Sequence, residues 1–233
     1  MRHDRPTAPT ALVIPMHNEA SVISGVIAAA RAHFATIICV DDGSADDCAA
    51  LAREAGAIVV RHPTNLGQGA ALETGIRHAL RLRDIEYVVT FDADGQHDVR
   101  DAASMVRMAQ DLDLQVVLGS RFLEPTGTVP AHRRAVLRAA VRFTRSTTGL
   151  DVTDAHNGLR VLRRDAAERI RLRLHGMSHA SEILNVIARE SFSYGEHPVT
   201  VTYTSYSQAK GQRGYNALNI LYDLALHRLR AAA

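Results

Sequence analysis

A regular alternation of short apolar segments with helix-forming segments constrains the fold of this chain most. Five apolar segments that contain Val or Ile predict buried strands, at 11–15, 36–41, 57–61, 85–92 and 114–120. Segments of helical composition lie between them, at 21–32, 46–55, 69–82 and 99–111. Because parallel strands are usually joined through a helix, this alternation predicts a mostly parallel, Rossmann-like sheet with helices on both faces.

The second half of the chain has a different pattern. Helices are predicted at 130–147, 178–190 and 215–230, and residues 197–206 alternate between apolar and polar as a strand does. A length of 233 residues suits one α/β domain with a long C-terminal elaboration. We therefore expect an α/β fold of a single domain, 1–233, that ends in amphipathic helices.

Composition excludes several classes of protein. Hydrophobic residues make up 46% of the chain and charged residues 22%, which is ordinary for a protein with a packed core. Every run without Asp, Glu, Lys or Arg is shorter than the ~18 residues of a membrane span, and the N-terminus has no secretory pattern. The two cysteines, Cys39 and Cys48, suggest a reducing compartment. We therefore expect a cytoplasmic protein without a transmembrane helix.

The charge pattern gives no argument for nucleic acid as a partner. The net charge is +2, only 5% of the residues are aromatic, and no nucleic-acid recognition module is present. The arginine-rich helix from Ala131 is better explained as a solvated charged face. Signatures of serine hydrolases, HExxH metalloproteases and kinases are absent. Among the 27 Lys and Arg residues, Lys210 is the only lysine, and genome base composition can explain that ratio.

Polar residues gather where three of the predicted strands end. They occupy positions 15–19 after the first strand, 41–44 after the second and 92–97 after the fourth. In an open parallel sheet, ligands bind outside the carboxyl ends of the strands. The three clusters therefore predict a single binding cleft at that edge.

The pair Asp92 and Asp94 is the sharpest chemical feature. Carboxylates two residues apart at the end of a strand can converge on one cation, and Gln96 adds a third oxygen. A set of oxygen ligands suits Mg²⁺ or Mn²⁺, and such an ion would neutralise a diphosphate. The alternative is a polar turn that caps the following helix.

Two other segments have competing interpretations. Asp42, in the segment 41–44, can accept a hydrogen bond from a ribose hydroxyl or a base N–H, or it can belong to an Asx-type turn that caps the next helix. The segment 65–71 is rich in glycine, but Leu72 stands where a dinucleotide-binding loop has its third glycine. A tight loop with close backbone packing explains this segment better.

Together these segments resemble family 2 glycosyltransferases, in particular the dolichol-phosphate mannose synthase-like enzymes that transfer sugars to polyprenyl phosphates. Seven motifs match in the family order and span about 200 residues: VIPMHNEA (13–20), VDDGSADD (40–47), NLGQGAA (65–71), FDADGQH (91–97), GSRF (119–122), VTDAHNGLRVLRRD (152–165) and SYSQAKGQ (205–212). The resemblance implies a nucleotide-diphospho-sugar transferase fold, with residues 11–122 binding the nucleotide sugar and residues 123–233 binding the acceptor.

The resemblance also implies roles for individual residues. The nucleotide base and ribose would be lined by Pro15, His17, Glu19, Val40 and Asp42. The metal and the diphosphate would be held by Asp92, Ala93, Asp94 and Gln96, with Asp94 as the most direct ligand. Arg121 and Lys210 would bind phosphate, and Asp154 would be an acidic residue on the acceptor side. Some relatives have a phosphate-binding arginine where this chain has Thr204, which implies either weaker contact with the pyrophosphate or replacement by Arg133, Arg134 or Arg160.

The implied activity is inverting, metal-dependent transfer of a hexose from a UDP- or GDP-sugar. A polyprenyl phosphate acceptor is already anionic and needs no general base, whereas a soluble hydroxyl acceptor would need Asp154 as the base. Arg133, Arg134 and Arg138 favour the lipid phosphate. A nucleotide-sugar-binding protein without catalysis is the third alternative, against which the intact Asp42, Asp92 and Asp94 argue.

The same resemblance raises the question of membrane contact, because many relatives carry C-terminal membrane spans. Arginines beside apolar residues in 131–146 and 215–230 suit helices that lie at a membrane surface without crossing it. We therefore predict peripheral association through one or both segments. The alternative is that these helices pack on the sheet or form a contact in a homodimer.

Overall fold

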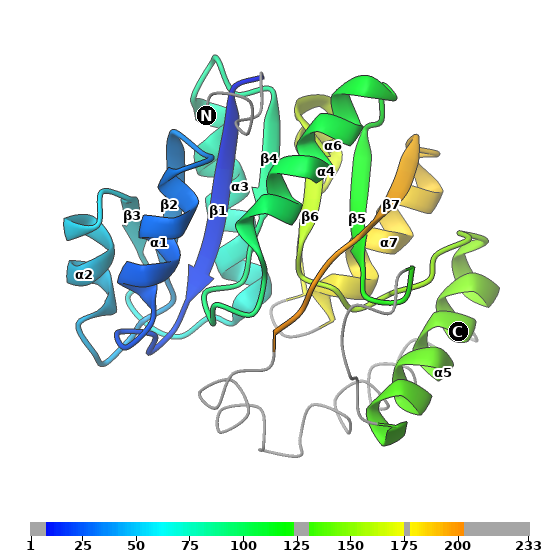
Figure 1. The fold of residues 1–233 in the computed structure, drawn as a ribbon, viewed down its shortest axis with the longest axis horizontal. Coiled ribbons are helices and arrows are strands. Elements are labelled where there is room, and N and C mark those ends of the chain that lie inside the picture. The colour runs from blue at the N-terminus through cyan, green and yellow to red at the C-terminus, as the bar shows by residue number, and fades with distance from the viewer. Residues whose placement is uncertain (1–7, 124–130, 175–177, 203–233) are drawn as a thin grey trace.

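The computed structural model describes residues 8–123, 131–174 and 178–202, and Figure 1 shows their arrangement around one sheet. The sheet has seven strands in the order β3-β2-β1-β4-β6-β5-β7. The strands are β1 (Thr10–Met16), β2 (Thr36–Asp41), β3 (Ile58–Arg61), β4 (Tyr87–Thr90), β5 (Val116–Ser120), β6 (Arg160–Arg163) and β7 (Tyr194–Pro198). Among the strands of the described residues, only β6 runs antiparallel to its two neighbours, β4 and β5.

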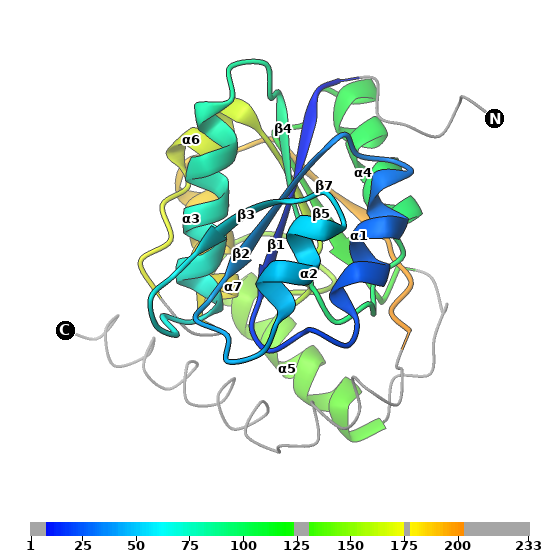
Figure 2. The same cartoon turned by 90° about the vertical axis from the view of Figure 1, so that its left-hand side faces the viewer.

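Helices cover both faces of the sheet, as Figures 1 and 2 show. The helices are α1 (Ile23–Arg31), α2 (Cys48–Glu54), α3 (Gln68–Arg81), α4 (Val99–Asp111), α5 (Ala131–Thr148), α6 (Arg164–Arg169) and α7 (His179–Arg189). One hydrophobic core lies between the sheet and α3, α6 and α7, and a second lies between the sheet and α1, α2 and α4. Strands buried on both faces must be apolar along their whole length, which is why β1 is buried at every residue.

The structure confirms the mostly parallel α/β sheet and the five strands predicted in the first half of the chain. It differs in the second half. Strand β6 and helix α6 were not predicted, because β6 has only two apolar residues between arginines and shows no measurable period. Strand β7 begins at Tyr194, earlier than the predicted strand over 197–206, and residues 203–206 of that prediction lie outside the described residues.

Two other features of the described part of the chain bear on the membrane question. Helix α5 lies beyond the sheet, on the side toward which β1 runs (Figure 1). None of the described helices combines the length and the apolar composition that crossing a bilayer requires. The predicted helix over 215–230 lies outside the described residues.

Candidate active site

The polar clusters after β1 and β2 are joined by hydrogen bonds at the carboxyl edge of the sheet. The backbone N–H of Asn18 donates to Ser44 Oγ over 3.0 Å, and the Asn18 side-chain oxygen accepts from Ala45 N over 2.9 Å. The His17 ring donates to the backbone oxygen of Asp42 over 3.0 Å. The sheet therefore brings these two clusters together, as the sequence predicted.

The carboxylate of Asp42 is buried and binds the loop that follows β3. It accepts from the His62 ring at 2.8 Å, from Leu66 N at 2.9 Å and from Gly67 N at 2.7 Å. Burial alone would raise the pKa of Asp42, but these hydrogen bonds outweigh it and hold the pKa below its usual range. In this structure, Asp42 therefore fixes the loop that borders the predicted nucleotide pocket.

The other residues predicted to line the base and ribose differ in their position relative to the cleft. Pro15 is buried at the end of β1, and Glu19 lies just beyond it with 6% of its surface exposed. Val40 is fully buried in the core beneath α3, so its side chain does not line the cleft. Alternate residues of a strand point to opposite faces, and Val40 points to the α3 face. That Val40 takes part in the nucleotide pocket stays a prediction.

Asp92 lies directly beyond β4 and is held from several sides. Its Oδ1 accepts from the Gln68 side chain at 3.1 Å, and its Oδ2 accepts from His97 Nε2 at 3.2 Å. Burial would raise the pKa of Asp92, but the His97 hydrogen bond and the nearby charges of His179 and Arg160 keep it low. The side chain still exposes 29% of its surface, so an ion or a ligand can reach it.

Asp94 has the opposite electrostatic environment. Burial and the neighbouring carboxylate of Asp92 raise its pKa to about 6, and Glu19 contributes in the same direction. Its Oδ1 accepts from the backbone N–H of Gln96 at 3.0 Å. The charges of Asp92 and Glu19 therefore give Asp94 a negative surrounding potential, which a bound cation would relieve.

This donor set fits a hard divalent cation. Among the described residues, no group of three His, Cys, Asp or Glu side chains is arranged as a complete metal site. Mg²⁺ does not need one, because it is commonly bound by one or two carboxylates together with substrate phosphates. Asp92 and Asp94 supply two carboxylates, and Gln96 carries an amide oxygen in the same loop. Ala93, between the two carboxylates, is buried in the core.

Asp154 and Arg121 form a buried ion pair. Arg121 Nε lies 2.7 Å from Asp154 Oδ2, and Arg121 Nη2 lies 2.9 Å from Oδ1. The side chain of Asp154 is 0% exposed, and that of Arg121 is 9% exposed. Burial would raise the pKa of Asp154, but Arg121 outweighs it and holds the pKa below its usual range. A carboxylate in this state is a weak proton acceptor, so the structure disfavours Asp154 as a general base.

Arg160 is the first residue of β6, and its charge interacts with the carboxylates of Asp92 and Asp154. It is 3% exposed, and burial lowers its pKa to about 10, against the opposing effect of Asp92 and Asp154. The sequence suggested Arg160 as one replacement for the arginine missing at Thr204, and in the structure its charge interacts with both of these carboxylates. The side chains of Arg133 and Arg134 lie outside the described residues, as do Thr204 and Lys210 entirely.

The segment that leads toward Lys210 starts at this site. Thr202 N donates to Gln96 O at 2.9 Å, and Thr200 N donates to Asp101 Oδ2 at 2.7 Å. His97 and Val201 also form an isolated antiparallel bridge. The chain is therefore fastened to the loop of Asp92 and Asp94 immediately before the undescribed segment begins.

Sequence reasoning missed three residues that shape the site: Gln68, His97 and Gly158. A Cβ atom on Gly158 would lie 2.4 Å from Asp92 Oδ2, so a larger residue would displace that carboxylate. Gln68 and His97 both lie in motifs that the sequence singled out, but only the structure shows that their side chains meet Asp92. Their spacing along the chain gives no sign of this contact.

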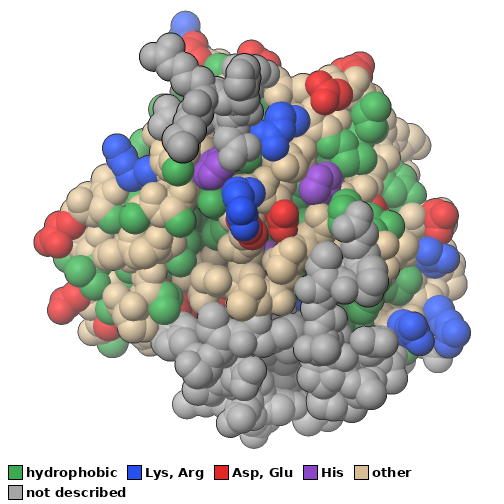
Figure 3. Space-filling view, viewed as in Figure 1, with side chains coloured by type: hydrophobic (Ala, Val, Ile, Leu, Met, Phe, Trp, Pro, Cys, Tyr) green, Lys and Arg blue, Asp and Glu red, His purple; other side chains and the backbone are tan. Residues whose placement is uncertain are grey.

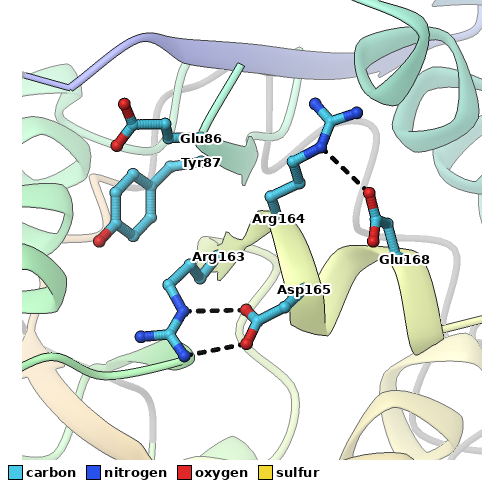
Figure 4. Close-up of a pocket in the computed structure, with 6 residues that line it drawn as sticks. All are labelled: Glu86, Tyr87, Arg163, Arg164, Asp165 and Glu168. Atoms are coloured by element: carbon cyan, nitrogen blue, oxygen red, sulfur yellow. Dashed lines mark hydrogen bonds and ion pairs between the residues drawn. The ribbon is translucent and has the colours of Figure 1, made fainter. Parts of the chain in front are cut away.

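A separate shallow pocket of about 320 Å³ lies at the opposite end of the sheet, beside Tyr87 at the start of β4. Figure 4 shows Arg163 against Asp165 and Arg164 against Glu168 in this pocket. These charges neutralise one another, so the pocket offers less to an ionic ligand than the carboxyl edge does. On the face in Figure 3, charged side chains of both signs are interspersed with uncharged surface.

Comparison with known proteins supports a common ancestry across most of the chain. The model of Glycosyl transferase family 2 matches residues 11–171. A UDP-N-acetylglucosamine–dolichyl-phosphate N-acetylglucosaminyltransferase of Methanococcus voltae is 29% identical over 94% of this chain and 95% of its own. The polyprenol monophosphomannose synthase of Mycolicibacterium smegmatis is 30% identical over 95% of this chain and 87% of its own.

Solved structures share the fold at lower identity. Glucosyl-3-phosphoglycerate synthase of Mycobacterium tuberculosis superposes with a TM-score of 0.67 at 19% identity, covering 95% of this chain and 81% of that one. A complex of that enzyme with Mn²⁺, UDP-glucose and phosphoglyceric acid has a TM-score of 0.64 at 17% identity, over 94% of this chain and 80% of that chain. These likenesses show that the chain shares the fold of that enzyme.

Proposed function

Because this chain belongs to glycosyl transferase family 2 and is a glycosyltransferase, we propose that it transfers a hexose from a UDP- or GDP-sugar to a polyprenyl or dolichyl phosphate, with inversion at the anomeric carbon. By their names, one of the two relatives transfers N-acetylglucosamine to dolichyl phosphate, and the other makes polyprenol monophosphomannose. Their matches extend over nearly the whole of both chains, which supports a lipid phosphate acceptor here.

The observation that carries the choice of acceptor is the buried pair of Asp154 and Arg121. A hydroxyl acceptor must lose a proton as it attacks, and Asp154 was the candidate base. With both its oxygens bound to one guanidinium, Asp154 is poorly suited to that role. A phosphate acceptor is already ionised and needs no base, so the geometry favours it.

The other residues of the site would each have a separate role in the reaction. Mg²⁺ or Mn²⁺ bound at Asp92 and Asp94, with Gln96, would neutralise the charge that develops on the departing nucleoside diphosphate. Asp42 fixes the loop over 66–67 beside the nucleotide pocket. Arg160 provides a buried positive charge that interacts with Asp92 and with Asp154. Lys210 would add a flexible cation for phosphate, which Arg would not reproduce because its planar group differs in reach and hydration.

A direct assay tests this proposal. The purified full chain is incubated with Mg²⁺ or Mn²⁺, a panel of UDP- and GDP-sugars, and polyprenyl phosphate, and products are extracted into organic solvent. We expect a lipid-linked sugar whose formation stops with EDTA. Transfer to a soluble acceptor with no lipid product would contradict the proposed acceptor, and nucleotide-sugar binding without any product would contradict catalysis.

We also propose that α5 meets the membrane surface that carries such an acceptor. Arg138 and Arg142 are exposed one helical turn apart on α5, and Arg145 follows on the same side. Cations near an anionic lipid surface contribute about 1 kcal/mol each to binding. The position of α5 on the carboxyl side of the sheet (Figure 1) would place the site close to that surface.

The double variant Arg138→Gln, Arg142→Gln is expected to bind vesicles containing phosphatidylglycerol about tenfold or more weakly, because two surface charges are lost. Co-sedimentation with vesicles at low salt measures this. Arg81→Gln, Arg83→Gln is the matched control, since both arginines are exposed at the end of the sheet opposite the site. Equal losses in the two double variants would show that net charge matters and the surface of α5 does not.

A further inference from the structure

We propose that Gln68 is a positioning residue that fixes the Asp92 carboxylate for the metal and the diphosphate, and that the loop before it ties Asp92 to Asp42. This inference rests on the donor-binding role proposed above. It gives a function to the glycine-rich segment 65–71, which matches no phosphate-binding loop. The supporting evidence is a continuous set of hydrogen bonds between two polar clusters.

The loop before Gln68 is anchored by Asp42. The Asp42 carboxylate accepts from the backbone N–H groups of Leu66 and Gly67 at 2.9 and 2.7 Å. It also contacts His62, whose Nε2 lies 2.9 Å from Thr74 Oγ1 on α3. The loop is therefore fixed from β2 on one side and from α3 on the other.

The backbone of this loop leaves little freedom. Gly67 has a φ of 95°, in the left-handed region that other residues rarely adopt. Gly43, next to Asp42, lies so close to the loop that a Cβ atom on it would be 2.4 Å from the carbonyl carbon of Thr64. Close packing therefore adds to the hydrogen bonds of Asp42 in holding residues 64–67.

Gln68 follows this fixed loop directly and opens α3. Its Nε2 donates to Asp92 Oδ1 at 3.1 Å, while His97 Nε2 donates to Oδ2 at 3.2 Å. Because Gly158 has no side chain, it leaves room for the Asp92 carboxylate on a third side. Each oxygen of Asp92 is thus oriented by one donor, and further acceptor positions on each oxygen stay open for a cation.

This arrangement joins clusters that belong to strands which are not neighbours, because β1 lies between β2 and β4. Asp42 follows β2 and Asp92 follows β4, and the segment from Leu66 to Gln68 connects them through its hydrogen bonds to both carboxylates. Groups that orient a metal ligand typically change metal affinity 10–100-fold when they are removed. Removing the Gln68 amide should therefore weaken cation binding without disturbing the fold.

The test uses Gln68→Met, which keeps the length of the side chain but removes the donor. Mn²⁺ binding to the full chain is measured by the electron paramagnetic resonance signal of free Mn²⁺, with and without UDP. Gln110→Met, in the last turn of α4 at the far end of the sheet, is the matched control. We expect Gln68→Met to bind Mn²⁺ about tenfold more weakly in the presence of UDP, with wild-type urea unfolding.

The outcomes separate this inference from the proposed function. If the wild-type chain does not bind Mn²⁺ in the presence of UDP, the proposed metal role fails and the inference falls with it. If the wild-type chain binds Mn²⁺ and Gln68→Met binds it equally well, only the inference is overturned. A parallel loss of unfolding free energy in Gln68→Met, absent in Gln110→Met, would also overturn it by showing a role in stability alone.

Discussion

Asp94→Asn is expected to reduce sugar transfer by at least about 100-fold, because the side chain that we propose as the most direct metal ligand then loses its charge. The asparagine has nearly the same shape, so the loop over 92–97 can keep its hydrogen bond from Gln96 N. The rate of lipid-linked sugar formation at saturating Mn²⁺ measures the effect. Asp84→Asn, at an exposed site between α3 and β4, is the control.

When metal is absent, Asp94→Asn is expected to leave the free energy of unfolding unchanged or to raise it. Burial and Asp92 raise the folded-state pKa of Asp94 to about 6, whereas an unfolded Asp ionises near 4. The folded state therefore binds more protons between these values, and its stability falls as pH rises from about 4 to about 6. Asp94→Asn removes this penalty.

Urea unfolding in EDTA as a function of pH checks the second effect. The difference between the wild-type chain and Asp94→Asn should grow as pH rises from about 4 to about 6 and level off above that range. A variant that unfolds more easily than the wild type at pH 7.5 would contradict the environment assigned to Asp94. Full activity in Asp94→Asn would remove Asp94 from the metal site.

Asp154→Asn is expected to lower the free energy of unfolding by about 3 kcal/mol or more, because it leaves the buried guanidinium of Arg121 without its counter-charge. The pair is almost completely removed from water, and both bonds of the guanidinium to the carboxylate are shorter than 3 Å. Urea unfolding measures the loss. The double variant Arg121→Met, Asp154→Leu should recover much of it, since apolar replacement of both partners removes the unpaired charge.

The pH dependence of activity in Asp154→Asn distinguishes the two acceptor classes. If Asp154 serves only as the counter-charge of Arg121, the remaining activity keeps the wild-type pH profile. If Asp154 is a base for a hydroxyl acceptor, the acidic limb of the profile disappears and the rate falls far more than the stability does. That second result would overturn the choice of a phosphate acceptor.

The first half of the fold was predictable because its signals are local. Strands β1, β2, β4 and β5 are mostly apolar runs that the sheet buries, β3 is a short apolar run at its edge, and the helices between them have apolar faces. β6 gave no such signal, since Val161 and Leu162 are its only apolar residues. Its antiparallel place between β4 and β5 depends on partners far away in the sequence.

The candidate site, like the fold, was predictable from the sequence only in part. The sequence by itself determined which residue types stand at the strand ends, including Asp42, Asp92 and Asp94, because the edge of a parallel sheet is fixed by where each strand stops. Tertiary structure decided what these side chains do there. It directed Val40 into the core, paired Asp154 with Arg121, and brought Gln68 and His97 to Asp92. Such contacts depend on side-chain direction and on packing between distant segments, and neither is encoded in the spacing of residues along one chain.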